Sequence, residues 1–89
     1  MNIKDLEEFR VLLDDVLYAP TKNEAKLPIK KLEFFVIQSK GEVDNYLHGI
    51  MKTIVNHAIE ASGQVQNKEH WLSNVEDNWN YLKMELDLD

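Results

Sequence analysis

The sequence of 89 residues contains no cysteine, three glycines and two prolines. The absence of cysteine excludes disulfide bonds, a thiol nucleophile and a thiolate metal site. With 44% hydrophobic and 29% charged residues, the chain does not have the composition of collagen or of a low-complexity sequence, and disorder is disfavoured. A chain of this length holds at most one packed core, so we expect residues 1–89 to form a single domain.

Long hydrophobic runs are also absent. No run is longer than Phe34–Ile37, whereas a transmembrane helix needs about 20 apolar residues. The first residues, Met1–Asp5, do not show a signal-peptide pattern. We therefore expect a cytoplasmic protein with no membrane partner.

Basic residues are in the minority, ten against sixteen acidic ones, which gives a net charge of −6. Binding to duplex nucleic acid needs a positive surface that neutralises phosphates, so direct duplex binding is disfavoured. The charge is unevenly spread, because residues 1–21 sum to −3, 22–40 to +3, 41–67 to −2 and 68–89 to −4. An acidic protein with one basic segment is the result.

Apolar side chains at helical spacing predict a first helix over residues 3–18. Asn2 is placed to cap its N-terminus. Pro20 prevents its continuation and disfavours helical geometry at Ala19, so this helix is expected to end near Tyr18.

The next segment allows two interpretations. Thr21 and Glu24 have the spacing of a capping box, but Pro28 is unfavourable inside a helix. Either a capped turn leads into a kink, or a helix begins at Pro28. Residues 32–37 are rich in strand-forming types, yet no second strand is available to pair with them. We therefore predict a short helix near residues 28–38.

A longer helix is predicted over residues 40–62. Ser39 and Glu42 again have capping-box spacing, and the apolar positions that follow occupy an unusually wide arc. We expect this helix to lie at the centre of the fold with neighbours on several sides. Because the apolar positions stay in phase through Ser39 and Gly41, residues 29–62 form either two helices or one long kinked helix.

The last helix is predicted over residues 68–87, after a helix end at Ser62 and Gly63 and a cap at Asn67. Its core stripe advances in steps of three and four residues: Leu72, Val75, Trp79, Leu82 and Leu86. The predicted fold class is all-α, a small antiparallel helical bundle of three main helices plus a short helical segment.

A second line of side chains runs beside that stripe and combines aromatic rings, amides and two acids. Protein interfaces are enriched in Trp and Tyr, so we predict that this line binds a partner. Its members are Trp71, Asn74, Asn78 and Tyr81, flanked by Glu76 and Asp77. The alternative for Trp71 is that its ring closes the edge of the core.

Catalytic and metal-binding patterns are missing. His48, His57 and His70 do not have the paired spacing with carboxylates that a metal site in a helical bundle needs. The adjacent acidic pairs suggest solvated faces, and neither a nucleophile elbow nor a phosphate-binding glycine loop is present. We expect no enzyme activity, no metal and no cofactor.

Residues 20–33 read Pro-Thr-Lys-Asn-Glu-Ala-Lys-Leu-Pro-Ile-Lys-Lys-Leu-Glu. This stretch resembles the helical-hairpin segment of the phage cyclic-nucleotide sponge proteins that counter CBASS immunity, in which a proline and a cap precede a Leu-x-x-x-Lys-Leu-Glu run. The resemblance implies an oligomer that sequesters signalling nucleotides. It also implies that Lys22, Lys26 and Lys30 contact phosphate.

Small size, acidity and the lack of catalytic motifs favour a non-enzymatic binding protein that acts stoichiometrically. By analogy with small phage counter-defence, antitoxin and immunity proteins, we expect an inhibitor or adaptor that docks on a macromolecular partner, a protein with a basic surface. The alternative is the oligomeric sponge that uses the basic segment 22–31. A homo-oligomer is compatible with both.

Overall fold

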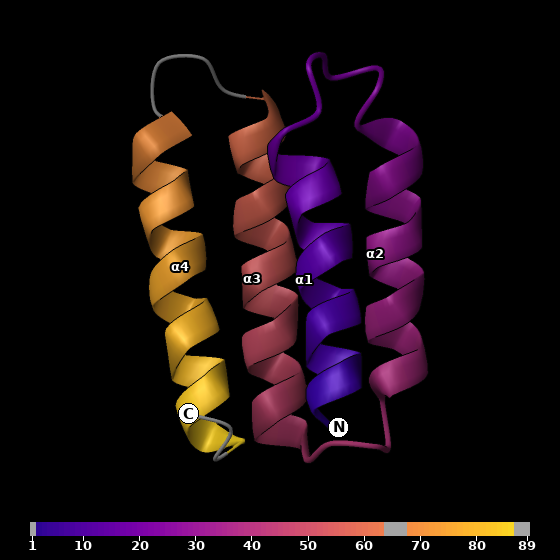
Figure 1. The fold of residues 1–89 in the computed structure, drawn as a ribbon, viewed down its shortest axis with the longest axis vertical. Helices are drawn as coiled ribbons and strands as arrows, with labels where there is room; N and C mark the ends of the chain where they lie inside the picture. Colours follow the sequence, from indigo (N-terminus) through magenta and orange to yellow (C-terminus); the bar gives the residue numbers. More distant parts are fainter. Residues whose placement is uncertain (1, 64–67, 87–89) are drawn as a thin grey trace.

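The computed structural model describes residues 2–63 and 68–86, which form four α-helices and no strand. The helices are α1 (Ile3–Leu17), α2 (Lys26–Ser39), α3 (Asn45–Gly63) and α4 (Lys68–Glu85). Successive helices run in opposite directions (Figure 1). From left to right in that view the order is α4, α3, α1 and α2. The all-α antiparallel bundle is confirmed for these residues, and the predicted short segment is a full helix of 14 residues.

α1 begins and ends where the sequence predicts. The Asn2 side chain accepts a hydrogen bond from the Asp5 N–H at 2.9 Å, and the Asp5 carboxylate accepts one from the Asn2 N–H at 3.2 Å. Two backbone donors that a helix start leaves free are thereby satisfied. The helix ends at Leu17, with Tyr18 as its C-cap.

α2 follows a capped turn. The Thr21 hydroxyl accepts a hydrogen bond from the Glu24 N–H at 3.1 Å, and residues 22–25 are turn rather than helix. α2 then begins at Lys26, two residues before Pro28. Pro28 lies in the first turn, where amide groups have no partner within the helix, so its missing N–H costs no intrahelical hydrogen bond. The choice of helix over strand for residues 29–38 is confirmed.

The predicted start of the central helix at Lys40 is wrong. Ser39 is the last residue of α2, and its hydroxyl donates to the Phe35 carbonyl at 2.9 Å instead of capping a new helix. Gly41 adopts a φ of +95°, which few other residues tolerate. Asp44 provides the cap, because its Oδ1 accepts from the Leu47 N–H at 2.8 Å. Residues 29–62 are therefore two helices rather than one.

The last helix matches its predicted pattern. α4 spans Lys68–Glu85, slightly shorter than the predicted 68–87, and the predicted cap at Asn67 lies outside the described residues. Val75, Trp79 and Leu82 are buried, while Leu72 and Leu86 are partly buried against the core. The predicted core stripe of α4 is confirmed.

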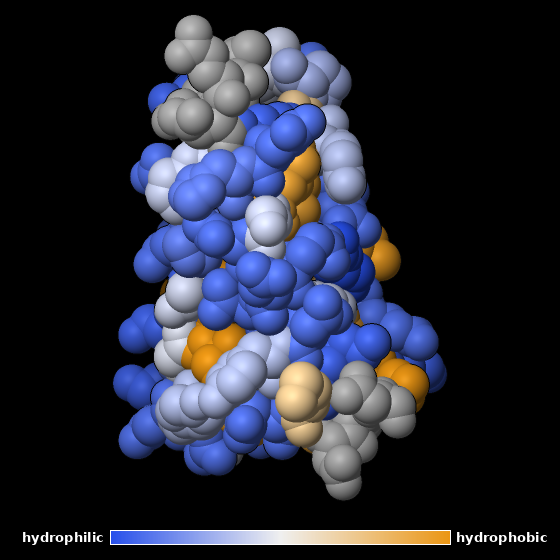
Figure 2. Space-filling view, turned by 90° about the vertical axis from the view of Figure 1, so that its left-hand side faces the viewer, coloured by the Kyte–Doolittle hydropathy of each residue, from blue (hydrophilic) through white to orange (hydrophobic). Residues whose placement is uncertain are grey.

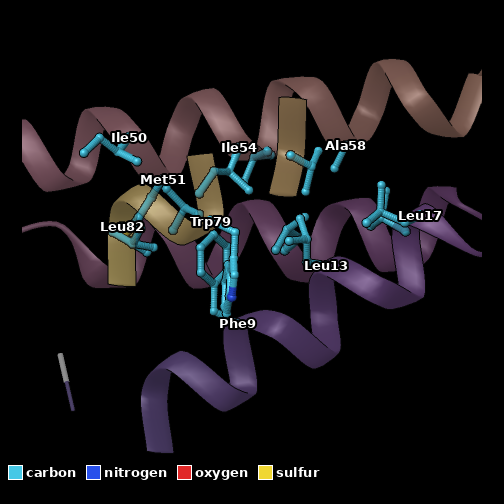
Figure 3. Close-up of a cluster of buried hydrophobic side chains, with 14 of the residues drawn as sticks. Phe9, Leu13, Leu17, Ile50, Met51, Ile54, Ala58, Trp79 and Leu82 are labelled. Carbon is cyan, nitrogen blue, oxygen red and sulfur yellow. The ribbon is translucent and has the colours of Figure 1, made fainter. Parts of the chain in front are cut away.

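The core lies between α3 and the other three helices, each of which packs on α3. Its centre is Phe9 of α1, whose ring stacks on Phe35 of α2 with centroids 5.5 Å apart and contacts Trp79 of α4 at 5.6 Å. Met51 and Ile54 of α3 close the cluster (Figure 3). The expected central position of the third predicted helix is confirmed, and its wide apolar arc serves three neighbours.

A side-chain contact also joins α3 to the C-terminal end of α2. The His48 ring nitrogen Nε2 lies 3.0 Å from the carbonyl oxygen of Val36, one of the last four carbonyls of α2. Such carbonyls have no partner within a helix, so the imidazole satisfies one of them. In the parts of the chain that the structure describes, no helix is long and apolar enough to cross a membrane.

Candidate functional site

The predicted line on α4 borders α3. At one end Tyr81 contacts Tyr46 of α3, and at the other Trp71 contacts His57 of α3. Asn74 and Asn78 occupy the positions between these two aromatic contacts. We call this surface the α3–α4 seam, and it consists of the residues Tyr46, His57, Trp71, Asn74, Asn78 and Tyr81.

The Trp71 end of the seam is half-buried. The Trp71 ring lies 5.4 Å from the ring of His57 and 5.4 Å from that of His70, and it also packs against the hydrophobic core. The alternative that Trp71 closes the edge of the core therefore has a basis in the structure, and its role in binding a partner stays a prediction.

The amides in the middle are partly engaged within α4 itself. The Asn78 side-chain NH₂ donates to the Asn74 carbonyl at 2.8 Å, and the Asn74 side chain lies 3.4 Å from Nε2 of His70. Both asparagines are half-buried. Their hydrogen bonds to α4 and to its own side chains hold the amides in place between the aromatic ends.

The Tyr46 end of the seam is the most exposed. The hydroxyl groups of Tyr46 and Tyr81 are hydrogen-bonded to each other, and the rings meet edge to face with centroids 6.4 Å apart. Even so, Tyr46 is 56% exposed and Tyr81 42% exposed. The hydrogen bond with Tyr81, with smaller contributions from desolvation and from the negative charges of Tyr81, Glu85 and Asp44, raises the pKa of Tyr46 to about 12.

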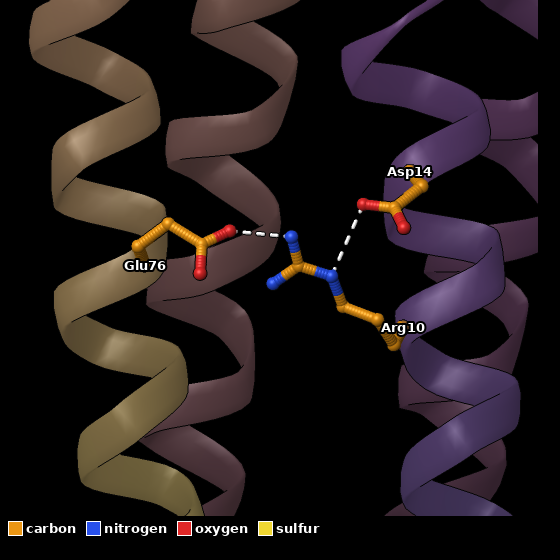
Figure 4. A network of polar contacts seen from close by, with 3 residues as sticks. All are labelled: Arg10, Asp14 and Glu76. Carbon is orange, nitrogen blue, oxygen red and sulfur yellow. Dashed lines mark hydrogen bonds and ion pairs between the residues drawn. The ribbon is translucent and has the colours of Figure 1, made fainter.

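The two acids predicted to flank this line lie in different surroundings. Glu76 turns toward α1, where its carboxylate pairs with the guanidinium of Arg10 (Figure 4). Asp77 is exposed. Of these two acids, Asp77 is therefore the one that a partner approaching the seam can contact without displacing Arg10.

Arg10 joins α1 to α4. Its Nε lies 3.1 Å from Oδ1 of Asp14, and its guanidinium carbon lies 5.2 Å from the centroid of the Trp79 ring. Desolvation lowers the pKa of Arg10, but the hydrogen bond to Glu76 and the charges of Asp14 and Glu76 outweigh it, and the net pKa is raised. The charged guanidinium thus covers one edge of the core through ring contact and ion pairs.

The lysines implied by the family resemblance are all exposed. Lys22 lies in the turn before α2, whereas Lys26 and Lys30 lie four residues apart in α2 and share one face of it. The segment around Lys22 is not helical, so the three lysines do not continue one helical stripe. They form an open basic surface at the start of α2.

The histidines and carboxylates of the described residues are not gathered into one cluster. Within residues 2–63 and 68–86, no group of three or more His, Asp and Glu side chains is close enough to hold a metal ion. His48 is bonded to the Val36 carbonyl, and His57 faces Trp71. The α3–α4 seam contains two exposed phenol rings and two hydrogen-bonded amides, with carboxylates nearby.

Sequence reasoning missed two members of the seam, Tyr46 and His57. By spacing, Tyr46 belongs to the apolar arc predicted for residues 40–62, and the sequence singles out His57 only in the search for metal ligands. Tyr46 lies at the edge of that arc, next to the polar positions Asn45 and Gly49, which was the one signal that its ring faces outward. No protein-family model, curated protein or solved structure matches this chain.

Proposed function

We propose that this protein is a non-catalytic binding module whose α3–α4 seam docks on a basic surface of a partner protein. The observation that carries the proposal is the Tyr46–Tyr81 pair. Both rings are substantially exposed although their hydroxyls are bonded to each other, and the charges of Glu85 and Asp44 act on Tyr46. Rigid aromatic rings beside carboxylates suit a lysine or arginine side chain.

The physical basis is twofold. A cation over an aromatic ring gains about 0.5–1 kcal/mol at an exposed site and more once water is excluded. Tyr and Trp also bury a large area while losing little rotamer freedom, which is why they dominate interface energies. The hydrogen bond between Tyr46 and Tyr81 holds both rings before the partner arrives, so less entropy is lost on binding.

The charge of the whole protein supports the same partner. A net charge of −6 attracts a basic surface over long range and raises the rate of association. The face on the side of α4 is mostly hydrophilic, with only small hydrophobic areas (Figure 2). A polar, acidic surface with a few aromatic anchors is typical of reversible docking. Within this class we propose an inhibitor or adaptor, by analogy with small counter-defence, antitoxin and immunity proteins.

A nucleotide sponge is the second candidate. It is favoured by the exposure of Lys22, Lys26 and Lys30 and by the shared face of the last two. Their charges suit phosphate groups, which lysine binds as a point charge. In that case a cyclic di- or trinucleotide stabilises the protein against heat. Charge reversal at Lys22 and Lys26 would then abolish the shift.

The docking proposal is tested by capturing the partner on the immobilised protein at low salt and measuring its affinity for variants. Tyr81→Ala is expected to weaken binding by about tenfold or more while the helix content stays unchanged. Val11→Ala is the matched control, because Val11 is exposed on the outer face of α1. Equal affinity of both variants, or loss of folding in Tyr81→Ala, contradicts the proposal.

A further inference from the structure

The outer face of α2 exposes three large apolar side chains. Leu27 is 62% exposed, Phe34 60% and Ile37 67%. Their spacing of seven and three residues places them in one stripe along the solvent side of the helix, opposite the buried positions Leu32 and Val36. Apolar residues at this spacing are typical of a helix that packs along another helix.

Three lysines and one acid lie beside this stripe. Lys26, Lys30 and Lys31 are exposed on α2, as is Glu33, and the segment 22–40 carries a charge of +3 in a protein whose net charge is −6. The other three segments of the chain are all negative. The apolar stripe therefore lies in the basic part of an acidic molecule.

A shallow groove adjoins the stripe between α2 and α3. It has a volume of about 210 Å³ and is bordered by Glu33, Val36 and Ile37 of α2 and by Lys52, Val55 and Asn56 of α3. Ile37 belongs both to the stripe and to the groove. A side chain from a helix lying on the stripe can therefore enter the groove beside Ile37 and be buried there.

We infer that the outer face of α2 binds an acidic amphipathic helix of a partner protein. The apolar stripe of that helix packs on Leu27, Phe34 and Ile37, and its flanking carboxylates face the lysines of α2. Charge selects this occupant over a second copy of the chain paired through the same face. Symmetric pairing would bring Lys26, Lys30 and Lys31 of two copies together, which is repulsive.

This surface is separate from the α3–α4 seam. α2 and α4 lie at opposite edges of the bundle (Figure 1). The seam suits a basic partner, whereas the α2 face suits an acidic one. A chain that holds both at once connects two proteins of opposite charge, which is the property of an adaptor.

The experiment is a selection from a displayed library of helical peptides. Every peptide carries an apolar stripe, and the flanking positions vary among Glu, Lys and Gln. The full chain is the target, and enriched peptides are expected to carry Glu at the flanks. Their affinity is expected to fall by about tenfold in Phe34→Ala and in the double variant Lys30→Glu, Lys31→Glu. High salt is expected to weaken binding to the unaltered chain and to reduce the effect of the double variant, because salt screens the ion pairs.

Two controls separate this proposal from the proposed function. Val11→Ala removes an equally exposed apolar side chain from α1, and Tyr81→Ala alters only the seam, so both are expected to bind the selected peptides unchanged. Failure to enrich any peptide, enrichment of Lys at the flanks, or affinity unaffected by Phe34→Ala overturns the inference. So does self-association of the protein that Phe34→Ala abolishes, because a second copy would then occupy this face.

Discussion

The hydroxyl groups of Tyr46 and Tyr81 are hydrogen-bonded to each other across the α3–α4 seam, although 35 positions separate the two residues in the chain. The contact lies at the surface and buries neither ring fully. It therefore contributes less to the core than to the arrangement of the seam, where it fixes the orientation of two exposed aromatic side chains. The proposed docking surface depends on this arrangement.

The Tyr46–Tyr81 hydrogen bond predicts a dependence of stability on alkaline pH. It raises the pKa of Tyr46 to about 12, above its ordinary value of 10.0, because the bond favours the neutral phenol. The stabilisation is complete below about pH 10 and is lost as the pH rises through about 12. In Tyr81→Phe the Tyr46 ring is expected to ionise at lower pH, as followed by the NMR signal of its Cζ. An unchanged titration would contradict this contact.

Phe9 is predicted to be the most sensitive core position. It is fully buried and lies between Phe35 and Trp79. Phe9→Ala is expected to cost about 3–5 kcal/mol of the free energy of unfolding, through lost burial and a residual cavity. Phe9→Leu is expected to cost clearly less, because it retains most of the volume. Urea denaturation of both variants measures the difference, and equal stabilities would show that the ring is not packed.

The two competing caps between α2 and α3 give a direct comparison. Asp44→Ala removes the acceptor of the Leu47 N–H and is expected to destabilise the protein by about 1 kcal/mol. Ser39→Ala removes only a bond to the carbonyl of Phe35 within α2, and a smaller loss is expected. Thermal unfolding of the two variants tests the order. The reverse order would restore Ser39 as the helix cap.

We expect the Arg10–Glu76 ion pair to contribute little to the free energy of unfolding, and the contact of Arg10 with the Trp79 ring to contribute more. Glu76→Gln is expected to cost about 0.5 kcal/mol, because the Glu76 side chain is 49% exposed and solvent screens the pair. Arg10→Ala also loses the contact with the Trp79 ring, so about 1–2 kcal/mol is expected. A double-mutant cycle separates the two parts. A coupling energy well above 1 kcal/mol would contradict a screened pair.

Glu76 and Asp77 are neighbours on α4, but we expect only Asp77 to affect partner affinity. Its carboxylate is held by Arg10 on the side of α1, so Glu76→Gln is expected to leave partner affinity nearly unchanged. Asp77→Asn removes an exposed charge of the same helix and is expected to weaken binding and its salt dependence. Isothermal titration of the captured partner compares them. A larger loss in Glu76→Gln would place the docking surface on the other flank.

Local patterns in the sequence predict most of the helices. The cap at Asn2, the stop before Pro20 and the stripe of α4 depend on residues a few positions apart, and each agrees with the structure. The predicted start of α3 is wrong because Ser39 and Glu42 have capping-box spacing, whereas Asp44, which provides the cap, has no Glu or Gln three residues later. The choice between Ser39 and Asp44 depends on Gly41, whose positive φ breaks the chain direction between the two helices.

The site was harder to predict because its contacts are distant in sequence. The aromatic line on α4 could be read from spacing alone, but its partners Tyr46 and His57 come from another helix. In the same way, nothing local to Glu76 indicates that Arg10 holds it, since 66 positions separate them. Periodicity shows which side of a helix is polar, and only packing shows which polar residues are already engaged.

The most direct test of the proposed function is an NMR titration of the full chain with an oligo-arginine peptide at physiological salt. The protein has a second acidic surface on α1, around Glu7, Glu8 and Asp15, where charge alone would draw the peptide equally well. If the seam is the docking site, saturable shifts appear at Tyr46, Tyr81 and Trp71. Shifts confined to the α1 face, or shifts that do not saturate, would contradict it.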